Sequence, residues 1–247
     1  MPRKALQFIV AVGIVFLFMA TYAYAQEAAD AGADAHAHGK SWFELFKATG
    51  LVGILLLCTS MLGTGLLIQY ILSITEAKLN NPELLNQVEE LLNEGNAEEA
   101  YNLAESDRSF ASKLMAAAIS RSSGGYEEAR KGMEEPAAVE AFRLNAKISL
   151  LSLVGNIGPL LGLLGTVTGM ITSFQKIETM KAPTPGDLAV GVYESLVNTT
   201  IGLFIAITFL SAYFFMKNKL TDLTLRISNQ VGEVLSRTMT SQEGAAH

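Results

Sequence analysis

The 247-residue sequence contains a single cysteine, Cys58, which excludes an intramolecular disulfide framework. Positive charge is also scarce: the formal net charge is −6, which argues against a nucleic-acid partner. Only three histidines occur, and the pair His36 and His38 is too small a ligand set for a metal site. We expect neither a metal nor another cofactor, and no enzymatic activity.

Charged residues are missing from two long stretches, 48–75 and 148–175, each of 28 residues. A third stretch, 188–216, has 29 residues and a single charge, Glu194. An α-helix needs roughly 20 mainly apolar residues to cross a bilayer. The sequence therefore predicts an all-α membrane protein with three transmembrane helices in the mature chain, over these three ranges. We expect the second and third helices to be long and to extend into the cytoplasm.

The stretch 148–175 carries glycines along one side of its expected helix. They follow steps of three and four residues, and at about 100° per residue they fall within about 80° of the helix circumference: Gly155, Gly158, Gly162, Gly165 and Gly169. A bare stripe lets a neighbouring helix backbone come close, as small-residue interfaces do in membranes. Thr166 lies at the edge of the stripe, and Ser173 lies seven residues further along the same face. We predict a helix built for contact with other helices.

The first 25 residues have a basic start, an apolar middle and a small-x-small end at Ala23-Tyr24-Ala25. This pattern is typical of a cleaved secretory signal peptide. The alternative is an uncleaved signal anchor, which would add one membrane span. In either case we expect residues 26–47 to form an exported, periplasmic segment.

The stretch 76–147 is of a different composition, with 14 acidic and eight basic residues among leucines and alanines. Leucines at helical spacing after a proline predict a short helix over 82–93, followed by a second. Gly124 and Gly125 indicate a turn, and Pro136 is expected to open the helix that runs into the second span. We predict a helical domain whose charges form a solvated surface.

Basic residues set the expected orientation, because they concentrate on the cytoplasmic side of a membrane. The stretch 76–147 has eight and the tail 217–247 has four, whereas the exported segment 26–47 and the loop 176–187 have two each. We expect a periplasmic mature N-terminus, a cytoplasmic domain at 76–147, a periplasmic loop at 176–187 and a cytoplasmic C-terminal tail. Apolar residues at helical spacing extend the third helix into that tail: Leu220, Leu223, Ile227, Val231 and Leu235.

The third span has one small, polar face. Its members share about 140° of the helix circumference: Gly191, Glu194, Ser195, Asn198, Thr199, Gly202 and Ala206. Thr200 points roughly 100° away from Thr199. Glu194 lies about 9 Å into the span, where a charge usually faces a bundle interior or water. Either these hydroxyls bond their own backbone, or Thr166 and Thr199 face a shared interior in which protons or another helix meet them; the two small-residue faces favour the second reading.

Two segments carry a family resemblance. Residues 162–170 read GLLGTVTGM and residues 191–203 read GVYESLVNTTIGL. Both are similar to signatures of the MotA/TolQ/ExbB family of proton-channel subunits, and the chain most resembles its ExbB/TolQ branch. Thr166 and Thr199 fall on that family's threonines of the second and third spans, and Glu194 falls on its third-span acid. The resemblance thus implies a proton pathway through these three residues, with the glycines of both spans serving helix packing.

The resemblance also implies partners. It suggests a subunit of a bacterial inner-membrane motor, with usually five copies in a ring around the helices of an ExbD/TolR-like protein. The chain has no deep intramembrane Asp of its own, so the single span of that partner is expected to supply the titrating carboxylate. The output would be mechanical work on a TonB-like or TolA-like periplasmic transducer. Membrane lipids complete the expected surroundings.

Other functions stay open on the sequence alone. The chain can be a non-conducting membrane scaffold, or a flagellar-type stator if residues 1–25 are retained as a fourth span. A self-contained secondary transporter is disfavoured, because three spans without an internal inverted repeat do not suit that architecture.

Overall fold

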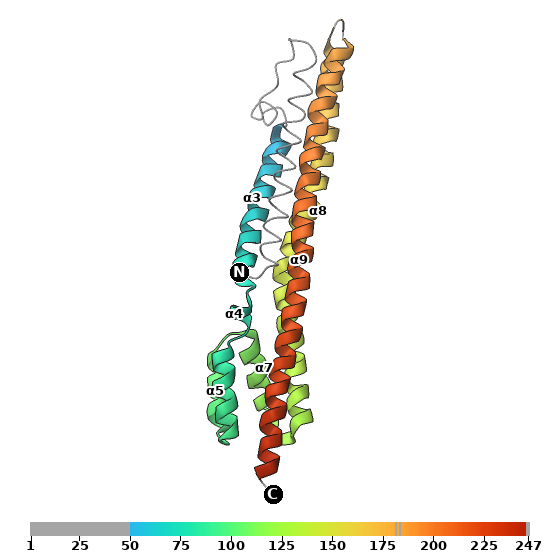
Figure 1. The fold of residues 1–247 in the computed structure, drawn as a ribbon. Helices are drawn as coiled ribbons and strands as arrows, with labels where there is room; N and C mark the ends of the chain where they lie inside the picture. The colour runs from blue at the N-terminus through green and yellow to red at the C-terminus, as the bar shows by residue number, and fades with distance from the viewer. Residues whose placement is uncertain (1–49, 181, 183, 246–247) are drawn as a thin grey trace, which may run out of the picture. The chain divides into compact units, whose positions relative to one another are not determined.

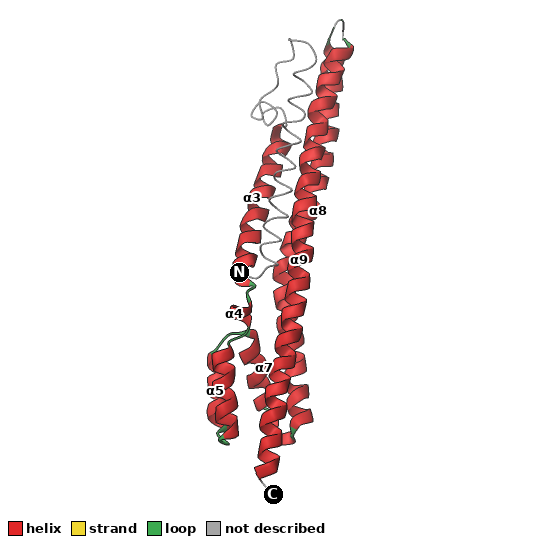
Figure 2. Ribbon diagram, viewed as in Figure 1, coloured by secondary structure: helices red, strands yellow, loops and turns green. Residues whose placement is uncertain are grey.

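The computed structural model describes residues 50–245, apart from 181 and 183. The expected signal peptide and exported segment lie outside the described residues. Every regular element in the described part is a helix, and no strand occurs there (Figure 2). Within residues 50–245, three helices are long and apolar enough to cross a membrane. This confirms the predicted all-α membrane class.

These three helices are α3, α8 and α9 (Figure 1), with the bounds Gly50–Ser73, Tyr126–Thr179 and Pro185–Ala245. The last two have 54 and 61 residues, far more than a bilayer requires, as the sequence predicts. The chain divides into two compact units. The span unit comprises the described residues up to Thr64 together with Ser152–Ser211, and the lobe unit comprises Gly65–Leu151 together with the described residues from Ala212 onward.

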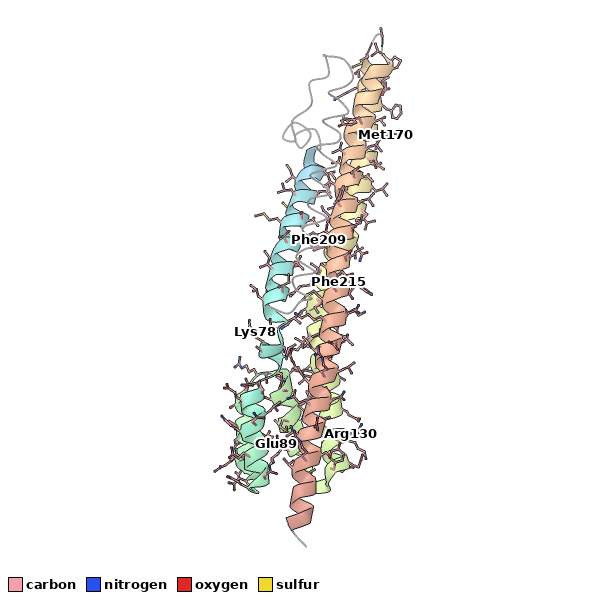
Figure 3. The ribbon with its side chains drawn as sticks, viewed as in Figure 1. Lys78, Glu89, Arg130, Met170, Phe209 and Phe215 are labelled. Carbon is pink, nitrogen blue, oxygen red and sulfur yellow. The ribbon has the colours of Figure 1, made fainter. Side chains whose placement is uncertain are left out.

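In the span unit, α3 packs against both of the other helices. A Cβ atom added at Gly63 of α3 would lie 2.6 Å from Cζ of Phe209 in α9 and 2.7 Å from Cγ1 of Val154 in α8. Phe209, labelled in Figure 3, is only 3% exposed. Other apolar side chains of this unit, such as Met61 and Leu160, are exposed. Such outward side chains suit lipid or the helix of another subunit.

The lobe unit contains the short helices, which are α4 (Glu76–Leu79), α5 (Pro82–Asn93), α6 (Ala97–Ser106), α7 (Phe110–Ile119) and the 3₁₀ turn η1 (Ser122–Gly124). The bounds of α5 confirm the prediction from the sequence. Its start is fixed by Asn81, whose side chain accepts a hydrogen bond from the backbone N–H of Leu84, and by Pro82 at the first helical position. Gly95 adopts a φ of +83° in the turn that follows.

The C-terminal part of α9 supplies one side of the lobe core. The five apolar residues that predict its continuation are all buried. They share the core with Leu85 and Val88 of α5 and with Leu114 and Met115 of α7, none of which is more than 2% exposed. The burial of this apolar stripe explains why the helix continues beyond the length that a membrane requires.

The structure corrects the expected start of the second long helix. That helix begins at Tyr126, directly after Gly125 with its φ of +86°, and Pro136 lies inside it. A proline inside a helix has no N–H to donate to the carbonyl four residues earlier, and its ring crowds that carbonyl. The residue at that position is Gly132, which also lets the backbone of α7 come close: an added Cβ would lie 2.9 Å from the Ala117 carbonyl oxygen. The charged first turns of α8 are therefore held by packing against α7.

Two acidic side chains tie α7 into the lobe. Asp107 accepts a hydrogen bond from the hydroxyl of Ser112 at 2.9 Å, and Glu140 of α8 accepts one from Nζ of Lys113 at 2.6 Å. Partial burial acts to raise the pKa of both carboxyls, but the bonds from serines at Asp107 and from the cations Lys113 and Arg143 at Glu140 outweigh it. The pKa values of Asp107 and Glu140 are therefore lower than those of free carboxyl side chains.

Acid should therefore weaken the lobe. A carboxyl whose pKa is lowered by folding contributes stability that is complete above its unfolded-state pKa of about 4 and is lost as the pH falls through the folded-state value. We expect the thermal midpoint of the purified chain, followed by circular dichroism, to fall between pH 6 and pH 3 by about 2–4 °C for each kcal/mol lost. Asp107→Asn should flatten this dependence, whereas Glu98→Gln, at an exposed acid of α6, should not. If the thermal midpoints of Asp107→Asn and Glu98→Gln depend on pH in the same way, the acid sensitivity does not come from Asp107.

Candidate functional site

The polar face of α9 packs against the glycine stripe of α8 inside the span unit. Each glycine of the stripe lies against a residue of α9, in antiparallel order: Gly155 against Leu210, Gly158 against Gly202 and Ile205, Gly162 against Thr199, Gly165 against Asn198, and Gly169 against Ser195. At its tightest point a Cβ on Gly202 would lie 2.5 Å from the Gly158 carbonyl oxygen. The two backbones approach this closely because neither residue has a side chain.

Thr199 makes a hydrogen bond from one helix to the other. Its hydroxyl donates to the carbonyl oxygen of Gly162 in α8 at 3.1 Å, and its side chain is partly buried. The hydroxyl of the neighbouring Thr200 instead donates to Leu196 of its own helix and is exposed. The structure therefore distinguishes the two adjacent threonines in the same way as the helical face drawn from the sequence.

Thr166 is also partly buried, but its hydroxyl donates to the carbonyl of Leu163 in its own helix at 2.7 Å. The α-helical repeat pairs the Gly162 carbonyl with the backbone N–H of Thr166. The hydroxyl of Thr199 thus reaches a carbonyl that lies one turn before Thr166. The structure therefore places Thr199 of α9 about one helical turn from Thr166 along α8, and each hydroxyl donates to a backbone carbonyl.

Asn198 is a polar residue of this interface whose role the sequence does not reveal. It is 4% exposed, it lies against Gly165, and its Oδ1 has no hydrogen-bond partner among the described residues. An unpaired buried amide oxygen is costly, most of all within a membrane span. The signal in the sequence is only its place on the polar face of the third span. Its free oxygen can accept a hydrogen bond from water or from a protonated group of a partner.

For the other predicted residues of α9, the structure gives fewer side-chain contacts. Glu194 and Gly191 lie within the helix, but the Glu194 side chain is outside what the structure describes. The hydroxyl of Ser195, which is 2% exposed, donates to the Val192 carbonyl at 2.7 Å. This bond accounts for Ser195 without a function in ion transfer.

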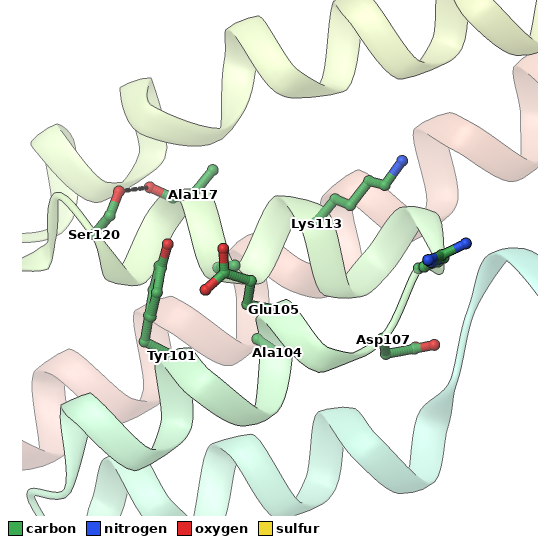
Figure 4. A pocket seen from close by; sticks show the side chains of 9 residues that line it. Tyr101, Ala104, Glu105, Asp107, Lys113, Ala117 and Ser120 are labelled. Carbon is green, nitrogen blue, oxygen red and sulfur yellow. Dashed lines mark hydrogen bonds between the residues drawn. The ribbon is translucent and has the colours of Figure 1, made fainter.

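A separate pocket of about 350 Å³ lies in the lobe unit, between α6 and α7 (Figure 4). Tyr101 and Glu105 line it from α6, and Lys113 and Ser120 line it from the α7 side. Lys113 is already bonded to Glu140, and the hydroxyl of Ser120 donates to the Ala117 carbonyl at 2.8 Å. We read this pocket as part of the lobe structure.

Comparison with known families decides the identity of the chain. Residues 103–229, about half of the sequence, match the model of the MotA/TolQ/ExbB proton channel family. The chain belongs to this family. The match includes the whole of α8 from its first turn, the glycine stripe, and α9 through Thr199 and Asn198.

Individual relatives place the chain on the ExbB/TolQ branch. An ExbB homolog of Methanothermobacter thermautotrophicus, described as a biopolymer transport protein, is 26% identical over 72% of this chain and 64% of its own length. An ExbB-like biopolymer transport protein of Synechocystis is 27% identical over 76% of this chain and 90% of its own length. The Tol-Pal system protein TolQ of Pseudomonas aeruginosa is 37% identical, but over only 35% of this chain and 38% of its own length. The chain thus spans less than two thirds of the first and third of these proteins.

Proposed function

We propose that this chain is the ring-forming subunit of a proton-driven motor in a bacterial inner membrane. In this role it is a channel and energy-transducing subunit and not an enzyme. The observation that carries the proposal is the cross-helix bond from Thr199 to the Gly162 carbonyl, within the segment that matches the family. The hydroxyl oxygen of Thr199 keeps acceptor lone pairs after this bond, and Oδ1 of the adjacent Asn198 is unpaired, so two acceptors for water or a protonated group lie inside a membrane span.

The proton pathway then runs beside Thr166, Thr199 and Glu194. Threonine hydroxyls do not titrate near neutral pH, so they position water or a titrating group rather than hold the proton. We propose that an ExbD/TolR-like partner with one span brings an Asp to this level. One charge that crosses a potential of 100 mV releases about 2.3 kcal/mol, enough for a modest movement of the ring against the inner helices. The output is work on a TonB-like or TolA-like periplasmic transducer.

The arrangement in the membrane follows the distribution of basic residues. We propose a mature N-terminus in the periplasm after removal of residues 1–25, the lobe in the cytoplasm, and a cytoplasmic C-terminus. The exposed apolar side chains of the span unit would face lipid and neighbouring copies, of which we expect five. N-terminal sequencing of the purified protein tests the cleavage, and a retained leader would favour a flagellar-type stator with four spans.

Copurification tests the partner. We expect the tagged chain, extracted in mild detergent from its own organism, to carry a short single-span protein with a central Asp, and native mass spectrometry to show five copies of the chain. Liposomes that hold this complex should take up protons when a potential is applied, and an Asp→Asn change in the partner should abolish the uptake. A scaffold would keep its cellular function after the proton gradient is dissipated by an uncoupler, and that result would overturn the motor.

A further inference from the structure

A second pocket lies in the lobe unit, directly after the end of α3. Its volume is about 520 Å³, and it is lined by α4, the start of α5 and one residue of α9: Glu76, Ala77, Asn80, Asn81, Pro82, Glu83 and Gln230. Glu76 follows the last residue of α3, Ser73, by three positions. The pocket therefore opens within about 10 Å of chain from the end of a membrane span.

Asn80 is the buried polar residue of this pocket. It is 7% exposed, and its Nδ2 donates to Oε1 of Gln230 at 2.9 Å. Its Oδ1 is buried and has no hydrogen-bond partner in the part of the chain that the structure describes. The bond to Gln230 fixes the plane of the amide, so Oδ1 of this pocket-lining residue is left without a partner. Such an oxygen calls for a hydrogen-bond donor.

The charged residues that line the pocket are both acidic. Glu76 and Glu83 are exposed acids in the lining, and the lining contains no Lys or Arg. Lys78 on the same short helix, labelled in Figure 3, does not line the pocket. From there to Arg108 the sequence has eight acidic residues and no basic one. The occupant must therefore bring positive charge as well as hydrogen-bond donors.

Two small occupants fit less well. A metal ion would need more ligands, since the described residues contain no cluster of three or more His, Cys, Asp or Glu, and the pocket is far larger than an ion. A lipid headgroup with an ammonium group also carries a phosphate, for which the lining offers no cation. An Arg or Lys side chain supplies hydrogen-bond donors and positive charge, needs no cluster of metal ligands and carries no phosphate.

We propose that this pocket binds an Arg or Lys side chain from the segment of a membrane-spanning partner that flanks its span. Short segments beside spans are rich in such residues on the cytoplasmic side, so the inference rests on the proposed function for the side on which the lobe lies. The chain around the pocket is held in place for this role, because Nζ of Lys219 in α9 donates to the Ile74 carbonyl at 3.0 Å. Glu76 and Glu83 attract the cationic head, and Oδ1 of Asn80 accepts one of its N–H groups.

Peptide binding to the full chain tests the proposal. The probe is a labelled pentapeptide Ala-Arg-Ala-Arg-Ala, titrated onto the protein in phosphatidylcholine nanodiscs, with citrulline replacing both arginines in the control peptide. We expect Glu76→Gln/Glu83→Gln to weaken binding about tenfold or more. The matched double variant Glu90→Gln/Glu94→Gln removes the same charge from exposed acids outside the pocket and should stay within about twofold.

The same titrations can overturn the proposal. Equal losses in the two double variants, or equal binding of the citrulline peptide, would show diffuse attraction to an acidic surface. Displacement of the peptide from the wild-type chain by phosphatidylethanolamine in the disc, or by millimolar Mg²⁺, would assign the pocket to a headgroup or an ion. No proton gradient is applied in these titrations, so their result does not depend on the proton pathway. If the pocket fails to bind the peptide, the proposed proton channel can still be correct, and the reverse also holds.

Discussion

Thr199→Val should reduce proton uptake by liposomes that hold the complete complex about 100-fold, the order of loss that follows when a reacting group is misplaced by about 1 Å. Valine keeps the shape of the side chain and removes the hydroxyl that donates to the Gly162 carbonyl. That carbonyl keeps its helical bond to the N–H of Thr166, so the helix pair should still form. Thr199→Ser retains the donor and should keep most of the uptake.

The matched control is the adjacent threonine. Thr200 bonds to Leu196 in its own helix and is exposed, so Thr200→Val should leave proton uptake unchanged. Thr166→Val should reduce uptake as well, because we expect its hydroxyl to turn from the Leu163 carbonyl toward the partner during transport. Wild-type uptake in Thr199→Val, or an equal loss in Thr200→Val, would remove Thr199 from the pathway.

Much of the fold can be predicted from the sequence because its signals are local. Long runs with at most one charge predict the spans, and Pro82 with the leucines that follow it at helical spacing predicts the start of α5. By contrast, α7 is not predicted, because apolar residues and alanines occupy eight of its ten positions and leave no clear polar face. Five of them are each at most 3% exposed: Phe110, Ala111, Leu114, Met115 and Ala118. A helix buried all round has no amphipathic period to detect. Pro136 misleads for the opposite reason, because a strong local signal is overridden by the packing of α8 on α7.

Only those features of the candidate site that depend on residue spacing along a single helix can be predicted from the sequence. Helical geometry separates Thr199 from Thr200 and groups the glycines of α8, because both depend on spacing along a single helix. The register between α8 and α9 depends on how Gly158 and Gly202 meet, 44 positions apart in sequence, and no periodicity encodes it. The unpaired oxygens of Asn80 and Asn198 follow from such registers, so neither can be found from the sequence.

The close packing of α8 against α9 should be lost when Gly158 or Gly202 is replaced by alanine. A Cβ at Gly202 would lie 2.5 Å from the Gly158 carbonyl oxygen, and one at Gly158 would lie 2.8 Å from the Gly202 carbonyl oxygen. Both obstacles are backbone atoms, which cannot turn aside as a flexible side chain can, so the helices must separate. Overpacking of this kind costs about 1–3 kcal/mol.

Alanine at Gly65 provides the comparison that isolates this effect. Glycine to alanine favours a helix by about 1 kcal/mol, and a Cβ on Gly65 of α3 meets nothing within 4 Å. We therefore expect Gly65→Ala to keep or raise the thermal midpoint of the purified complex, and Gly202→Ala to lower it despite the same gain in helix propensity. Separation of α8 from α9 also moves Thr199 away from Gly162, so Gly202→Ala should lose proton uptake together with stability. A Gly202→Ala protein that melts no lower than Gly65→Ala would mean that the backbones of α8 and α9 are not in contact in the purified protein.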